Sequence, residues 1–212
     1  MARLTAEHAA RSGVETSVPS QQDEPRMSDR NTLRIEGYAI VSEDGMLADA
    51  ARVMPGAMIF DADQRFFEQG LDGVDVVVHG RHSQERQARS PLRRRIVLTR
   101  SVPAIAPHSS NPRAVLWNPS GALLEQVLAE MGLAGASVGV IGGAEAFDVF
   151  LNRFSVFYLT RAPGVWLPGG RPVFLEVPGR TPENVLAAHG LRPDAPAVLD
   201  AAQNLTVVAW RR

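Results

Sequence analysis

Runs of β-branched and aliphatic residues that alternate with helical patterns constrain the fold of this chain more than any other feature. Short apolar runs bounded by turn residues are typical of buried strands, and apolar residues spaced three and four apart are typical of helices. Strands are predicted over residues 33–41, 74–78, 95–99, 114–117, 137–141, 155–160 and 205–210. Helices are predicted over 62–70, 121–131 and 144–151, the first ending at Gly70. This order predicts an α/β fold with a mostly parallel central sheet and an antiparallel edge formed by the late strands.

The composition excludes several kinds of chemistry. All 22 basic residues are arginine, and there is no cysteine, so thiol nucleophiles, thiolate metal sites, Schiff-base lysines and a P-loop lysine are ruled out. The net charge of −1 argues against nucleic acid and anionic membranes as partners, because both attract strongly basic surfaces. The histidines share no metal-ligand spacing, so no metal site is expected.

The first thirty residues differ in composition from the rest. Residues 1–30 contain almost no large apolar side chains and are predicted to be a disordered N-terminal tail, because they cannot bury enough surface to offset the entropy of ordering. Residues 31–212 are predicted to form one domain. No apolar run reaches the length of a membrane span, and no apolar signal core is found. We therefore expect a cytoplasmic protein, monomeric or homodimeric, that acts on a small molecule.

Three of the predicted strands end in small or basic residues. The segments are 79–83 (HGRHS), 98–100 (LTR) and 140–147 (VIGGAEAF). Ligands of open α/β sheets bind at the carboxyl ends of the strands, so these segments are expected to converge. Glycine lets a backbone approach a ligand closely, and an arginine fork suits a phosphate. Each segment alone is also consistent with an ordinary turn that carries solvated side chains, and the glycine pair is not a dinucleotide-binding fingerprint.

Acidic and basic residues near the first helix have two interpretations each. Asp61 and Asp63 flank the start of the helix that carries Phe66 and Phe67. Aspartate at this position normally caps a helix or complements its dipole. The alternative is a buried carboxylate that recognises a heterocycle. The arginine run at 93–95 either forms a solvated face or includes one arginine that binds a substrate carboxylate.

Taken together and in order, these segments resemble the dihydrofolate reductase superfamily, from about Ile35 to Thr160 and more weakly beyond. The block VIGGAEAFDVFL is the most specific, because it is similar to the family's Ile-Gly-Gly-x-x-x-Tyr-x-x-Phe-Leu motif. The other matching segments are YAIVSEDGMLA, DADQRFF, VVVHGRHS, PLRRRIVLTR and FYLTR. The resemblance implies a three-layer dihydrofolate-reductase-like α/β fold and an NADPH-dependent oxidoreductase.

The resemblance also implies a role for each matched residue. Asp63 would bind the amino and ring N–H groups of the substrate and help to protonate it, and Thr160 would orient that carboxylate. Phe67 would contact the substrate, and Arg93 would pair with the α-carboxylate of a folate tail. Arg81 and Arg100 would meet the 2′-phosphate of NADPH, and the glycine pair would contain a non-proline cis peptide. The full set implied for the cofactor is Gly80, Arg81, His82, Ser83, Thr99, Arg100, Ile141, Gly142, Gly143, Ala144 and Glu145.

The sequence departs from the family pattern on the substrate side. Gly56 follows Met54-Pro55 at the position where the family has tryptophan. When the chain is compared with the family pattern, the loop that leads to Asp63 is about two residues longer. Phe147 replaces the family's tyrosine. These changes leave the cofactor half of the resemblance intact and place the identity of the substrate in question.

Three functions remain open. The first is hydride transfer from NADPH to a dihydropterin, above all 7,8-dihydrofolate to tetrahydrofolate. The second lies in the same superfamily, because SEDGMLA and GGRPVF are similar to segments of the riboflavin-biosynthesis reductase, which acts on a 5-amino-6-ribosylaminouracil-type aminopyrimidine. The third is a degenerate nucleotide-binding module without turnover, which would be the better interpretation if Asp63 did not face the cofactor.

Overall fold

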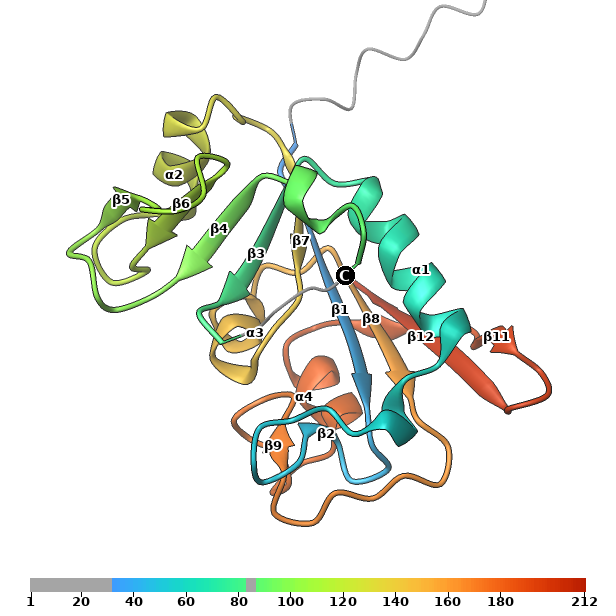
Figure 1. The fold of residues 1–212 in the computed structure, drawn as a ribbon. Helices are drawn as coiled ribbons and strands as arrows, with labels where there is room; N and C mark the ends of the chain where they lie inside the picture. The colour runs from blue at the N-terminus through green and yellow to red at the C-terminus, as the bar shows by residue number, and fades with distance from the viewer. Residues whose placement is uncertain (1–31, 83–86) are drawn as a thin grey trace, which may run out of the picture.

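The computed structural model describes residues 32–82 and 87–212 (Figure 1). A large sheet forms the middle layer. The helix α1 (Asp61–Asp72) covers one face, and the other face is covered by α2 (Leu124–Glu130), α3 (Ala144–Phe150) and α4 (Pro182–Ala188). The predicted three-layer α/β architecture is confirmed. The predicted tail lies outside the described residues.

The sheet is parallel in its centre and antiparallel at both edges. Its parallel strands lie in the order β8 (Val156–Arg161), β1 (Arg34–Val41), β7 (Ser137–Val140), β3 (Val76–Gly80), β4 (Arg95–Leu98) and β6 (Ala114–Trp117). The antiparallel strands are β5 (Ile105–Pro107) beside β6, β12 (Leu205–Arg211) beside β8, and β10 (Arg192–Pro193) and β11 (Ala197–Asp200) beside β12. The predicted antiparallel C-terminal edge is confirmed, and β5 adds a second one that the sequence did not indicate.

Four short elements lie outside this sheet. The strands β2 (Met46–Ala48) and β9 (Arg171–Pro172) pair with each other, and the single-turn 3₁₀ helices are η1 (Gly56–Met58) and η2 (Ser90–Leu92). The helix η1 lies between β2 and α1 along the chain.

Strand β3 is buried on both faces of the sheet, as its continuous valine run predicts. Val76 and Val78 belong to the apolar cluster under α2, α3 and α4, and Val77 belongs to the cluster under α1. The larger cluster is built around fully buried aromatic rings: Phe147, Phe150, Phe154, Phe157 and Phe174.

Two predicted helix boundaries are wrong. The first helix does not end at Gly70 but continues to Asp72, because Gly70 is a packing glycine: a Cβ there would lie 2.5 Å from the ring of Tyr38. The second helix begins at Leu124 and not at Gly121. Gly121 remains in a turn against the carbonyl oxygen of Pro103, which a Cβ would approach to 1.8 Å.

The topology reverses direction next to β1. From β1 the chain moves outward through β3, β4 and β6, and then returns to β7 and β8 on the two sides of β1. In α/β sheets a crevice forms at the carboxyl ends of the strands where the order reverses. None of the helices formed by residues 32–82 and 87–212 has the length and apolar character needed to cross a membrane.

Candidate functional site

Two glycine segments meet at the carboxyl ends of β3 and β7. The N–H of Gly80 donates to the carbonyl oxygen of Gly142 at 2.8 Å, and the N–H of Ile141 donates to the carbonyl oxygen of Val78 at 3.0 Å. The Gly142–Gly143 peptide is cis, as the resemblance implied, and Gly142 has a φ of +97°. Among the described residues, a Cβ on Gly143 would meet no atom within 4 Å, so they leave the space beside this backbone open.

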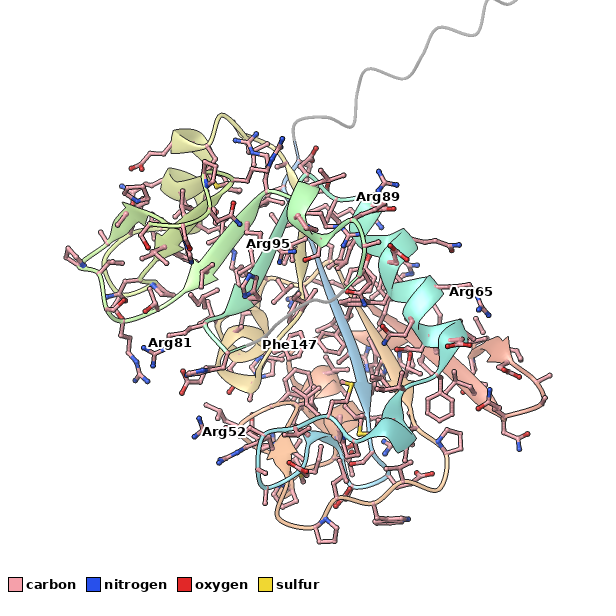
Figure 2. All side chains as sticks on the ribbon, viewed as in Figure 1. Arg52, Arg65, Arg81, Arg89, Arg95 and Phe147 are labelled. Carbon is pink, nitrogen blue, oxygen red and sulfur yellow. The ribbon has the colours of Figure 1, made fainter. Side chains whose placement is uncertain are left out.

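Arginine side chains lie at the rim of this edge. Arg81 follows β3 and is exposed, and Figure 2 shows it extending away from the body of the protein. Arg100 follows β4, and its side chain is 84% exposed. Its Nη2 lies 3.7 Å from Oε1 of Glu145 in the first turn of α3, so the ends of β4 and α3 are neighbours.

The structure therefore brings the described members of the predicted cofactor set together at the carboxyl ends of the parallel strands. Thr99 lies between β4 and Arg100, with its N–H bonded to the carbonyl oxygen of Trp117 at 2.9 Å. His82 is exposed beside Arg81, and Ala144 begins α3 directly after the glycine pair. Ser83 lies outside the described residues.

Asp63 is a buried carboxylate at the same edge. It lies in the first turn of α1 with 6% of its surface exposed, and it is hydrogen-bonded to Thr160, which is 2% exposed. Burial raises the pKa of Asp63 to about 6, although the hydrogen bond from Thr160 acts in the opposite direction. The residue at the helix N-cap is Phe60, and no side chain caps the helix. The structure thus favours a buried carboxylate over a helix cap, whereas Asp61 is exposed.

Aromatic side chains extend from Asp63 along α1. Phe67 lies one turn further and packs edge-on against Tyr38, with the ring centroids 6.2 Å apart. Ile141, the residue before the glycine pair, packs against the same cluster. Gly56 is exposed, and a Cβ there would meet no atom within 4 Å, so the position of the missing tryptophan is open.

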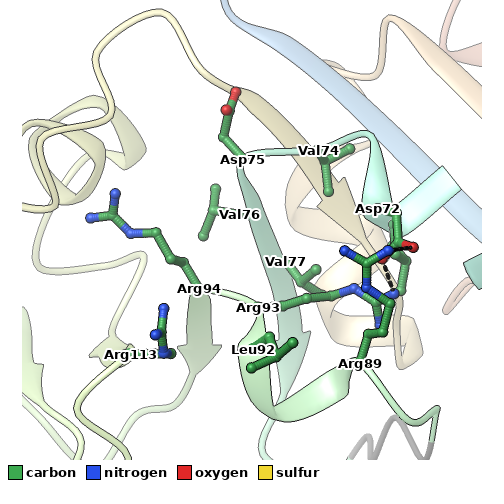
Figure 3. Close-up of a pocket in the computed structure, with 11 residues that line it drawn as sticks. Asp72, Val74, Asp75, Val76, Val77, Arg89, Leu92, Arg93, Arg94 and Arg113 are labelled. Atoms are coloured by element: carbon green, nitrogen blue, oxygen red, sulfur yellow. Dashed lines mark hydrogen bonds and ion pairs between the residues drawn. The ribbon is translucent and has the colours of Figure 1, made fainter. Parts of the chain in front are cut away.

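Arg93 lies at the other end of α1. Its Nη2 is 2.6 Å from Oδ1 of Asp72 and 3.4 Å from the carbonyl oxygen of Glu68. It lines a pocket of about 280 Å³ at the amino ends of β3 and β4 (Figure 3). Because the chain itself supplies a carboxylate to Arg93, the contact with a folate tail stays a prediction.

His79 begins the candidate segment 79–83, but the sequence analysis gave it no role of its own. It is 9% exposed, and its Nδ1 lies 2.9 Å from the carbonyl oxygen of Gly80, directly below the glycine segments. Burial lowers the pKa of this imidazole and so favours its neutral form. Its place in the sequence, a histidine in a buried valine strand just before Gly-Arg, was the available signal.

Comparison by sequence finds no relative of the chain, whereas comparison by structure does. No protein-family model matches the chain, and no curated protein gives a significant match. Solved structures do match. A putative riboflavin biosynthesis protein from Shewanella sp. PV-4 aligns with a TM-score of 0.56 and 18% identity, over 84% of this chain and 98% of that one.

Two further structures match equally well. Dihydrofolate reductase from Enterococcus faecalis, complexed with NADP(H) and RAB-propyl, aligns with a TM-score of 0.56 and 18% identity, over 84% of this chain and 96% of that one. A diaminohydroxyphosphoribosylaminopyrimidine deaminase/5-amino-6-(5-phosphoribosylamino)uracil reductase from Thermotoga maritima aligns with a TM-score of 0.56 and 15% identity, over 85% of this chain and 56% of that longer one. With the reversal of strand order beside β1, these alignments show that the chain has the dihydrofolate-reductase-like fold.

Proposed function

We propose that the protein is an NADPH-dependent reductase that transfers hydride to a dihydropterin ring. The observation that carries this proposal is Asp63, a carboxyl group buried at the carboxyl edge of the sheet with a pKa of about 6. Buried groups whose pKa is shifted toward neutrality, and which lie in a crevice of the fold, are candidates for proton transfer.

The residues at the carboxyl edge fit the cofactor. The open space beside Gly143 admits a flat group against the backbone. The exposed guanidinium groups of Arg81 and Arg100 can meet phosphates with charge-assisted hydrogen bonds. When bound, NADPH supplies the hydride. The chain contributes the position of the ring beside the glycines and the charge at the phosphates.

Asp63 and Thr160 fit the substrate. An ionised carboxylate accepts two hydrogen bonds, which matches the paired amino and ring N–H groups of a pterin. A carboxyl group that titrates near pH 6 can also hold the proton that the ring nitrogen needs. The hydroxyl of Thr160 can donate a hydrogen bond to this carboxylate.

A second candidate is the reduction of an aminopyrimidine, as in riboflavin biosynthesis. It is favoured by the contact between the two segments that carry that resemblance. Met46 in β2 pairs with Pro172 in β9, and the N–H of Val173 donates to the carbonyl oxygen of Gly45 at 3.0 Å. The same N–H donors on the ring would be recognised by Asp63, so the two candidates differ in the substituents of the ring and not in the chemistry.

The test is the oxidation of NADPH by the full-length protein in the presence of each candidate substrate. The three substrates are 7,8-dihydrofolate, a dihydropterin without a glutamate tail, and the aminopyrimidine ribotide. Turnover with a dihydropterin supports the first proposal, and turnover with the ribotide alone supports the second. If the protein binds NADPH tightly but turns over none of the three substrates, the result would support a nucleotide-binding module without catalytic activity.

A further inference from the structure

We propose that Asp72 occupies Arg93 from within the chain, so that the substrate carries no anionic tail at this end of α1. The inference rests on the proposed function and narrows its substrate to a dihydropterin without a carboxylate-bearing tail. It makes Asp72 a positioning residue that sets specificity through Arg93.

The ion pair lies in line with the ring site. Asp63 is in the first turn of α1 and Asp72 is its last residue, so nine residues separate them and the distance along the helix is about 14 Å. The guanidinium of Arg93 contacts α1 twice near that end, at Asp72 and at the carbonyl oxygen of Glu68. A tail that ran along α1 from a ring at Asp63 would therefore arrive at the same guanidinium that Asp72 holds.

Burial decides the competition for Arg93. The side chain of Arg93 is 8% exposed, and that of Asp72 is 27% exposed. Figure 3 shows Arg93 and Arg89 directed toward the same Asp72, with Arg89 2.8 Å from its Oδ2. A free carboxylate would have to displace one that is covalently tethered at high local concentration, and Asp72 would then keep only the exposed Arg89 as its ion-pair partner. An anionic tail consequently gains little at this position.

The position of Asp72 is not explained by the helix itself. An acidic side chain in the last turn of a helix is disfavoured, because the carbonyl end of the helix dipole is negative. At this position Asp72 instead forms ion pairs with Arg93 and Arg89. Asp72 therefore serves the arginines and not the end of α1.

The remaining arginines of the pocket do not replace Arg93 as a clamp. Arg94 donates to the carbonyl oxygen of Met131 at the end of α2. Figure 3 shows Arg94 and Arg113 on the opposite side of the pocket from Arg93 and Asp72. A tail that followed α1 would meet the neutralised pair first.

The experiment compares KM for dihydrofolate with KM for the tail-less dihydropterin, using the full-length protein. In the wild type we expect similar values for the two substrates. In Asp72→Asn the loss of the tethered carboxylate should lower KM for dihydrofolate by roughly 10-fold or more, the scale of one charge-assisted hydrogen bond, and leave KM for the tail-less dihydropterin unchanged. Binding of folate and of pterin, followed by quenching of protein fluorescence, gives the same comparison without turnover.

Asp75→Asn is the matched control. Asp75 lines the same pocket, but it accepts hydrogen bonds from the backbone and hydroxyl of Ser137 and not from Arg93. It removes the same charge and should not change the ratio of the two KM values. A ratio in Asp72→Asn equal to that of the wild type would overturn the inference.

A wild-type KM for dihydrofolate that is roughly 10-fold below that for the tail-less dihydropterin would overturn the inference by itself, even if Asp72→Asn does not fold. If neither ring is bound or reduced, the proposed function fails instead, so the two failures are distinguishable.

Discussion

The side chain of Thr160 on β8 is hydrogen-bonded to the carboxyl group of Asp63 in the first turn of α1, and both side chains are buried. The contact lowers the pKa of the carboxyl group, while burial raises it, and burial is the larger effect. The result is a carboxyl group that changes its protonation near pH 6 at the edge of the sheet where the glycine pair lies.

The first prediction concerns the charge of Asp63. Asp63→Asn keeps the size of the side chain but removes the charge and the titratable proton. We expect turnover to fall by at least about 100-fold, the scale of general acid–base catalysis, with NADPH affinity nearly unchanged. Steady-state kinetics and a fluorescence titration with NADPH measure the two effects.

Asp61→Asn is the control for that substitution. Asp61 lies in the same turn of α1 but is exposed, so its substitution should leave turnover near that of the wild type. Normal turnover in Asp63→Asn would show that another group supplies the proton, and the assignment of the substrate site would then fail.

The second prediction is the pH dependence of the reaction. If the protonated form of Asp63 provides the proton, kcat/KM should fall about tenfold per unit as the pH rises above the pKa of about 6. The residual rate of Asp63→Asn should lack this dependence. A pH profile of both proteins measures it, and identical profiles would rule out Asp63 as the titrating group.

The third prediction links the same pKa to stability. The folded state holds the proton of Asp63 up to about pH 6, whereas the unfolded chain releases it near the ordinary value of 3.8. The free energy of unfolding should therefore fall as the pH rises between these values, by up to about 3 kcal/mol. Asp63→Asn should not show this loss. Urea denaturation at about pH 4 and at pH 7 compares the two, and a parallel change in both would contradict the prediction.

The fourth prediction concerns the choice of cofactor. If Arg81 and Arg100 meet the 2′-phosphate, NADPH should bind more tightly than NADH by roughly 10- to 100-fold, and Arg81→Ala should remove much of that difference. Arg113→Ala is the control. Arg113 is exposed and directly precedes β6, so it lies at the amino ends of the parallel strands, away from the carboxyl ends where Arg81 and Arg100 lie. Equal affinities of the wild type for the two cofactors would refute the assignment.

The fifth prediction tests the packing of α1. Alanine is preferred over glycine in a helix, but a Cβ on Gly70 would lie 2.5 Å from the ring of Tyr38. Gly70→Ala should therefore destabilise the protein by about 1–3 kcal/mol, as expected for overpacking. At Gly73, the nearest atom to a Cβ is a carbonyl oxygen at 3.4 Å, so Gly73→Ala should be nearly neutral. Thermal unfolding of the two variants distinguishes steric packing from helix propensity.

The order and type of the main elements could be predicted from the sequence because each depends on local pattern. The valine run of β3 and the glycine pair after β7 are examples, and both lie where expected. The end of α1 could not be predicted in this way. Gly70 matches the pattern of a helix terminator, and only the tertiary contact with Tyr38 shows that it is a packing residue.

In the candidate site, too, some features could be predicted from the sequence and others depend on tertiary contacts. Asp63 and Thr160 were placed together by the resemblance, and the structure brings them into contact. The pairing of Arg93 with Asp72 was not foreseen, because nothing in the local sequence indicates which of several carboxylates a given arginine will contact. The choice depends on how α1 packs against the segment before β4.

The position of β8 determines when the site can be completed during synthesis. The glycine pair and its neighbours require only strands made by residue 140, so the glycine-lined half of the candidate site can assemble early. Thr160 lies on β8, which pairs with β1 on one side. Its other side stays unpaired until β12 is made, because Val207 in β12 is the register partner of Thr160. A nascent chain arrested between these strands would carry the glycine edge beside an exposed, aggregation-prone strand.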